Sequence, residues 1–503
     1  MALNLCGMKE VIVVLLPVFL GFVGTHAWLI VYGLLDHLPQ LPALAPQTLG
    51  DTRAIAGEIG WTGLAALLLL AYSQGGGTYT GLEAVSNNVN VLAEPRVRTG
   101  KLTMLYMALS LAFTAGGIIM LYLLWGARPV AGQTLNAVVF GSILGSFGWE
   151  AWSTQAWLLV VLVLEAGLLF VAANTGFLGG PAVLANMAAD SWVPHKFRYL
   201  STRLVTENGI LVLGLAALAI LLWTGGSVTL LVVLYSISVF LTFAVSLFGL
   251  CRYWLQSRGE PRWVVRFALS LLGFVVCAVI LAMLLVKKFL DGGWAALLII
   301  AAIVGVCLAV KRHYDWTKTQ IRKIDANFAD LPFGSVATPP ALDRAAPTAC
   351  FLVGSSKGGG LHTLLWVQRI FPGHFRNFVF ISVRTVDSRS YGGKEALAVM
   401  QTEASATLAY FVNFCHSNGL AAKSYIAFGT DPIEDFEQLS RKVQAAFSNV
   451  IFFTSRLVFE NENWFIRQLH NQAAMVLQRR LHLQGMQMMI LPMRLDLGRP
   501  ALP

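Results

Sequence analysis

The sequence predicts an α-helical membrane domain with several spans, followed by a soluble α/β domain built on a doubly wound sheet. Of the 503 residues, 56% are hydrophobic and only 12% are charged, whereas soluble proteins carry about 25% charged residues. Charged residues are sparse up to residue 312 and denser after it. These observations exclude a water-soluble enzyme for the whole chain, and they exclude disorder. We expect a membrane domain at residues 1–312, a cytoplasmic linker at 313–346 and the α/β domain at 347–503.

Eight apolar stretches are candidate membrane spans, because about 18 such residues are needed to cross roughly 30 Å of hydrocarbon. They lie near residues 11–35, 61–90, 102–125, 153–187, 209–223, 227–250, 264–286 and 293–310. The first stretch is too long for the apolar core of a secretory signal, so we interpret it as a span. The lipid bilayer is therefore the main partner of this part of the chain.

The distribution of basic residues predicts the orientation of these spans. Thirteen basic residues lie near the N-terminus, in the loops after the second, fourth and sixth stretches, or directly after the eighth, while four lie in the opposite loops. By the positive-inside rule, both termini of this chain face the cytoplasm. Only the pair Lys287 and Lys288 opposes this orientation. The net charge of +10 therefore reflects topology, and we expect no nucleic-acid partner.

A run of glycines and hydroxyls interrupts the second stretch and predicts a broken helix. Each glycine costs about 1 kcal/mol relative to alanine in a helix. Backbone groups freed at membrane depth are tolerated only where they are buried in protein or line a polar cavity, so the break predicts a substrate or ion site. A glycine-lined packing contact is the alternative. The break comprises Gly75, Gly76, Gly77 and Gly81, and the candidate ligands are Thr78, Tyr79 and Thr80.

Two carboxyl groups inside apolar stretches, Glu83 and Glu165, are candidates for proton coupling. An acidic group inside a span is expensive and by default marks a proton or cation path, although a structural carboxyl is the alternative for both. The sixth stretch carries Tyr235 and Ser236, followed by Ser238 and Thr242. This polar stripe fits a binding site, and hydroxyl bonding between helices explains it equally well.

After residue 347 the pattern changes to short β-rich runs that alternate with helical patterns, which predicts a mostly parallel, doubly wound sheet. We expect strands at 349–354, 378–383, 421–428, 450–454 and 486–492, with helices from about 360 and at 394–417, 433–447 and 464–483. The segment from Gly354 to Gly360 resembles an anion-binding turn only weakly, and an ordinary glycine-rich turn is the favoured interpretation. The spacing of Ser, His, Asp and Cys residues indicates no enzyme activity, no cofactor, no metal centre and free cysteine thiols.

Several motifs resemble permeases of the amino acid-polyamine-organocation (APC) superfamily, in particular the branch of KimA/KUP-type potassium importers. They are Gly76-Gly77-Thr78-Tyr79-Thr80-Gly81-Leu82-Glu83, Glu94-Pro95, Asp190-Ser191-Trp192-Val193-Pro194 and Asp291-Gly292-Gly293-Trp294. The resemblance implies a LeuT-type fold. Residues 3–10 resemble the start of the fifth family span, which implies that the four preceding spans are missing and the fold is incomplete. The tail resembles a universal-stress-protein domain, and the family resemblance implies a homodimer through this tail.

The resemblance implies a secondary active transporter in a bacterial inner membrane that imports K⁺ with H⁺ by alternating access. In this interpretation Thr80 offers oxygen to K⁺, Tyr235 lines the same site, and Glu83 carries the coupling proton. An amino acid permease is the main alternative, because exposed N–H groups at the helix break would also suit a substrate carboxylate. The third interpretation is a non-transporting, truncated membrane-tethered remnant or sensor.

Overall fold

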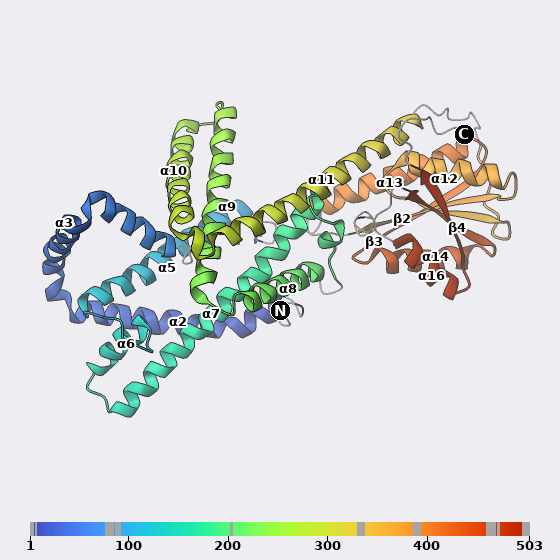
Figure 1. Cartoon of the computed structure of the whole chain (residues 1–503). Helices are drawn as coiled ribbons and strands as arrows, with labels where there is room; N and C mark the ends of the chain where they lie inside the picture. Colours follow the sequence, from blue (N-terminus) through green and yellow to red (C-terminus); the bar gives the residue numbers. More distant parts are fainter. Residues whose placement is uncertain are drawn as a thin grey trace. The chain divides into compact units, whose positions relative to one another are not determined.

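The computed structural model describes residues 5, 8–75, 85, 92–201, 205–328, 338–385, 394–458, 469 and 473–494. The chain divides into two compact units. One comprises Met1–Gly179 and Val212–Gly305, and the other comprises Gly180–Leu211 and Val306–Pro503 (Figure 1). The helices α7 (Ala151–Ala189), α8 (Glu207–Trp223) and α11 (Trp294–Asn327) each contribute to both units.

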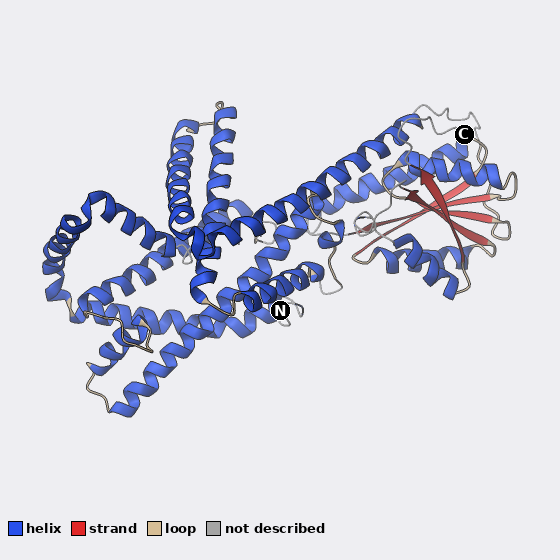
Figure 2. Cartoon of the chain, in the orientation of Figure 1, coloured by secondary structure: helices blue, strands red, loops and turns tan. Residues whose placement is uncertain are grey.

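The described part of the first unit is built of helices (Figure 2). Besides its parts of α7, α8 and α11, they are α2 (Met8–Asp36), η1 (Leu38–Gln40), α3 (Leu41–Gln74), α5 (Arg96–Leu124), α6 (Leu135–Gly145), α9 (Val228–Gln256), α10 (Trp263–Lys288) and the π-helical η5 (Phe289–Gly293). Among the described residues, six helical segments are long and apolar enough to cross a membrane. This part of the chain is a helical membrane-spanning region.

The six segments and the eight predicted stretches differ in how they are divided. Segment Trp263–Asn327 contains the last two stretches, and α8 is apolar but shorter than the six. The two stretches within the long segment are separated at η5, where Gly292 has a φ of 112° and Lys288 pairs with Asp291 at 3.0 Å. Within α3, non-helical Gly60 lies directly before the stretch predicted to begin at residue 61. The eight spans therefore remain a prediction.

Helices α2, α5, α6 and α7 share a buried apolar cluster in the first unit. It contains Leu29, Ile30, Leu121, Val139, Phe140, Ile143, Leu144 and Val161. The backbones of α2 and α7 approach each other closely at Gly167, where an added Cβ would lie 2.5 Å from Val18 Cγ1. Small residues at such positions let membrane helices pack at short distance. Polar side chains that α2 and α7 carry near this contact can therefore reach each other.

The second unit contains a five-stranded parallel sheet with the order β3-β2-β1-β4-β5. Its elements are β1 (Thr348–Leu352), α12 (Lys357–Ile370), β2 (Asn377–Thr385), α13 (Lys394–Ser417), β3 (Ala421–Gly429), α14 (Pro432–Ala446), β4 (Val450–Val458), α16 (Ala473–Leu483) and β5 (Gln487–Arg494). The prediction of an α/β region with a doubly wound sheet is confirmed. The helix expected at 464–483 is described from Ala473 onward, and residues 313–327, expected in the linker, continue α11.

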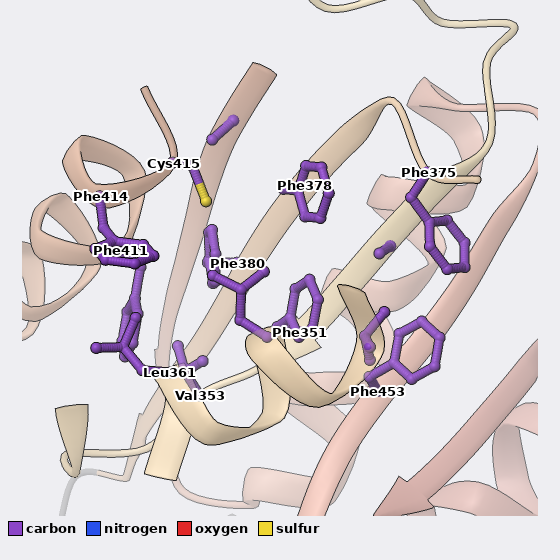
Figure 3. Close-up of a cluster of buried hydrophobic side chains, with 14 of the residues drawn as sticks. Phe351, Val353, Leu361, Phe375, Phe378, Phe380, Phe411, Phe414, Cys415 and Phe453 are labelled. Atoms are coloured by element: carbon purple, nitrogen blue, oxygen red, sulfur yellow. The ribbon is translucent and has the colours of Figure 1, made fainter. Parts of the chain in front are cut away.

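Side chains alternate between the two faces of this sheet, as they do along any strand. Phe351 and Phe380 face α12 and α13, in the aromatic cluster of Figure 3. Cys350 and Ile381 belong to the cluster formed with α14 and α16. Burial raises the pKa of the Cys350 thiol well above its usual value, and that of Cys415 to about 12. Both thiols therefore stay protonated and unreactive at physiological pH.

Candidate functional site

The C-terminal end of α3 lies against α9 in the first unit. The hydroxyl of Ser236, on α9, donates to the backbone carbonyl of Ser73 at 3.4 Å, and both side chains are buried. Leu69 and Leu70 of α3 pack on the apolar cluster that α9 forms with α10 and the start of α11. Gly75 caps α3, and its N–H bonds to the carbonyls of Ala71 and Ser73. A polar contact thus lies at the residues that immediately precede the predicted break.

The other residues of the predicted break and its candidate ligands lie outside the described residues, as does the proton-coupling candidate Glu83. The break and ligand residues concerned are Gly76, Gly77, Thr78, Tyr79, Thr80 and Gly81. Unwinding of the helix at Gly75 to Gly81 and ion binding by Thr80 therefore stay predictions. Of the remaining candidates, Tyr235 is half-buried on α9 beside Ser236.

The hydroxyls of the predicted polar stripe on α9 fall into two groups. Ser238 donates to the carbonyl of Leu234 at 2.8 Å, and Thr242 donates to the carbonyl of Ser238 at 2.8 Å. These bonds stay within the helix and satisfy each hydroxyl locally. Ser236 differs because its hydroxyl reaches a different helix.

Glu165, the second predicted proton-coupling residue, lies in a polar network that joins four helices of the first unit. Its Oε1 is 3.1 Å from His26 Nε2 on α2 and accepts a hydrogen bond from Asn136 Nδ2 on α6 at 2.6 Å. The hydroxyl of Tyr122, on α5, donates to Asn136 Oδ1. The His26 side chain is 1% exposed and that of Glu165 19%. A titratable pair is therefore held within the helical bundle.

The His26 ring is fixed from two further directions. It stacks on Phe22 with ring centroids 3.8 Å apart and meets the edge of Phe140 at 5.2 Å. Its Nδ1 lies 3.0 Å from the carbonyl oxygen of Phe22. Because these contacts orient the ring, Nε2 points at the Glu165 carboxyl.

Sequence reasoning had identified Glu165 but had missed His26, Asn136 and Tyr122. Histidine is costly inside an apolar span unless it has a polar partner, so His26 within the stretch 11–35 was the available signal. The sequence signal for Asn136 is weaker, because this residue lies near the start of the short helix α6 and next to a loop.

In the second unit, the loop after α7 is held against α11. Lys311 Nζ donates to the Asp190 carbonyl at 3.0 Å, and Tyr314 stacks on His195 with centroids 4.2 Å apart. The Tyr314 hydroxyl donates to the Leu469 carbonyl at 2.8 Å. Burial, followed by the charge of Arg198, lowers the pKa of His195 to about 4. His195 is therefore neutral at physiological pH and adds no charge to this basic loop.

The glycine-rich turn before α12 holds a carboxylate from the chain itself. Asp325 Oδ1, near the end of α11, accepts hydrogen bonds from the Gly358 N–H and the Ser356 hydroxyl, each at 2.7 Å. A helix N-terminus favours negative charge because its first N–H groups are unpaired. A Cβ at Gly358 would lie 2.8 Å from Asp325 Cα, so only glycine permits this approach. The turn thus attaches α11 to the α/β domain.

Replacing Asp325 with alanine should destabilise the α/β domain by about 1–3 kcal/mol, because two donors lose a charged acceptor. Chemical denaturation of the full chain, followed by hydrogen exchange in α12 and β1, measures this loss. Asp315→Ala is the matched control: this carboxyl lies on the same helix, is 56% exposed and pairs with Lys311. Its removal should cost within about 0.5 kcal/mol. Equal effects of the two substitutions would contradict the capping role.

Comparisons with known proteins agree on the membrane-spanning part. The amino acid permease family, as a sequence profile, matches residues 1–310. Over 275 residues the chain is 30% identical to the potassium transporter KimA of Bacillus subtilis (strain 168), an alignment that covers 55% of this chain and 44% of KimA. The chain therefore spans less than half of the length of that relative.

Proposed function

Because the chain belongs to the amino acid permease family, we propose that this multi-pass membrane protein is a secondary active transporter that imports K⁺ together with H⁺. In this proposal its spans form part of a LeuT-type fold and work by alternating access. They lie in a bacterial inner membrane, with both ends of the chain in the cytoplasm. The observation that carries the choice of potassium is the 30% identity with a potassium transporter.

The polarity of the end of α3 favours a cation as cargo. The C-terminal end of a helix carries partial negative charge, and a carbonyl or hydroxyl oxygen can replace the hydration shell of K⁺. In the proposal, the last turn of α3, the hydroxyl of Ser236 and Thr80 supply such oxygens. The buried bond from Ser236 to the Ser73 carbonyl supports this placement because it holds α9 at the end of α3.

The coupling proton requires a titratable group inside the bundle. Glu165 meets this requirement among the described residues, because it is mostly buried and lies next to His26. Glu83 stays a second candidate. A carboxyl that gains and loses a proton inside a span can link the proton gradient to movement of the cargo.

Uptake by the purified chain in liposomes tests the proposal. Radiolabelled rubidium, a substitute for K⁺, should accumulate when the external side is made acidic, and labelled leucine should not. Leucine uptake without rubidium uptake would indicate an amino acid permease. Uptake of neither would overturn the proposal and favour a membrane-tethered sensor.

Ser236→Ala should lower rubidium uptake about tenfold, which corresponds to one hydrogen bond of roughly 1.4 kcal/mol. The matched control is Ser238→Ala, on the same helix, because the Ser238 hydroxyl donates within its own helix, to the Leu234 carbonyl at 2.8 Å. This control should transport at the rate of the unmodified protein. If both variants transport normally, Ser236 is a packing residue and no part of the site.

A further inference from the structure

Both ring nitrogens of His26 face oxygen acceptors. Nδ1 lies 3.0 Å from the Phe22 carbonyl oxygen, and Nε2 lies 3.1 Å from Glu165 Oε1. A carbonyl oxygen can only accept, so Nδ1 must carry a proton to bond with it. Nε2 then either carries a second proton or accepts one from a protonated Glu165.

Among the residues that the structure describes, Thr25 is the one whose hydroxyl could reverse this assignment by donating to Nδ1. Its Oγ1 lies 3.3 Å from Nδ1 but 2.9 Å from the Gly21 carbonyl. A hydroxyl has a single proton to donate, and the carbonyl of the preceding turn is the nearer acceptor. Nδ1 therefore keeps its own proton, which it donates to Phe22.

The contact with Asn136 indicates where the remaining proton lies. Asn136 Nδ2 donates to Glu165 Oε1 at 2.6 Å, which is shorter than an ordinary N–H···O bond between neutral groups. Ionised acceptors shorten such bonds. The Tyr122 hydroxyl donates to Asn136 Oδ1, so the amide nitrogen is the atom directed at Glu165. Glu165 thus has the surroundings of a carboxylate.

We propose that His26 is the proton-carrying residue of the membrane region, held as an imidazolium by the Glu165 carboxylate. This inference rests on the proposed function and deepens it, because it moves the coupling proton from the carboxyl to the ring. The titratable groups that face Glu165 are His26 from α2 and Tyr122 from α5. The described residues of α6, Leu135–Gly145, include no ionisable side chain.

Loss of the Nε2 proton should change how helices α2 and α7 pack against each other. The N–H bond at Nε2 breaks, the proton leaves to water, and the ring keeps its Nδ1 proton and becomes neutral. The Nε2 lone pair then faces a carboxylate at 3.1 Å, which is repulsive. α2 and α7 are in close contact at Gly167. Loss of the proton therefore favours their separation, and its return favours the packed state.

Nitrogen NMR of the full chain in lipid bilayers, with isotope-labelled histidine, tests this proposal without any transport. The His26 signal is the one that disappears in His26→Gln. Its protonation state at neutral pH should be that of a ring with a proton on each nitrogen. Glu165→Gln should change that state to a ring with a single proton, because the anionic partner is gone. Glu150→Gln, an exposed glutamate just before α7, should not change it.

A singly protonated His26 at neutral pH in the unmodified chain would overturn the proposal, as would a ring that stays doubly protonated in Glu165→Gln. The transport readout is independent: His26→Gln should abolish the rubidium accumulation that an acidic external side drives. His37→Gln should leave the pH profile unchanged, because His37 lies in the turn directly after α2, away from Glu165, and pairs with Asp36 at 3.2 Å. Absence of rubidium uptake together with the expected NMR result would refute the proposed function alone.

Discussion

Glu165→Ala should reduce rubidium uptake to background and lower the stability of the membrane-spanning region by about 3–5 kcal/mol, the usual cost of removing one partner of a buried ion pair. The substitution takes the acceptor away from both His26, whose side chain is 1% exposed, and Asn136. Thermal melting of the chain in lipid nanodiscs measures the stability, and uptake in liposomes measures the function. Glu150→Ala, on an exposed residue, should change neither.

Glu165→Gln separates the structural role of this residue from its role in keeping His26 protonated. Glutamine keeps an oxygen that can accept from Asn136, so we expect a smaller loss of about 1 kcal/mol. Uptake should still be lost, because glutamine cannot hold His26 in its charged form. In a double-mutant cycle with His26→Gln, the two losses of stability should be non-additive by about 0.5–3 kcal/mol. Additive losses would show that the two side chains act separately.

The α/β domain was predictable from sequence because its signals are local. Runs such as Phe378 to Val383 are apolar and β-rich, and each lies between helical patterns, so strands and helices could be placed within a few residues. The order of the strands was not predicted, because it depends on which distant runs pair. The start of the linker was also difficult to predict. Asp325 lies in a polar segment, which suggested a linker, but that segment continues the helix of the last apolar stretch.

The candidate site was predictable only in part. Carboxyl and hydroxyl groups inside apolar stretches identified Glu165 and Ser236, because such groups are costly in lipid wherever they occur. Their partners could not be predicted, since His26 and Glu165 are 139 residues apart and Ser73 and Ser236 are 163 apart. Periodicity gives the face of a helix on which a residue lies, but the neighbouring helix is set by tertiary packing. His26 therefore became a candidate only once α2 and α7 were seen to touch.

Phe380→Ala should destabilise the α/β domain by about 3–5 kcal/mol, enough to unfold it partly in a protein of ordinary stability. Phe380 is fully buried, and its ring stacks between Phe351 and Phe411 with centroids 5.3 and 5.2 Å away (Figure 3). Removing the ring leaves a cavity between the sheet and the helices α12 and α13, which rigid strands cannot close. Urea denaturation of the full chain, followed by hydrogen exchange in β1 and β2, measures the loss.

Trp366→Ala is the control for Phe380→Ala, because this ring is 43% exposed on α12 and should cost about 1 kcal/mol or less. The NMR signal of His26 at neutral pH should be the same in Phe380→Ala as in the unmodified chain, since the two residues belong to different compact units. A change in that signal would contradict this expectation and show that the α/β domain controls the proton pair.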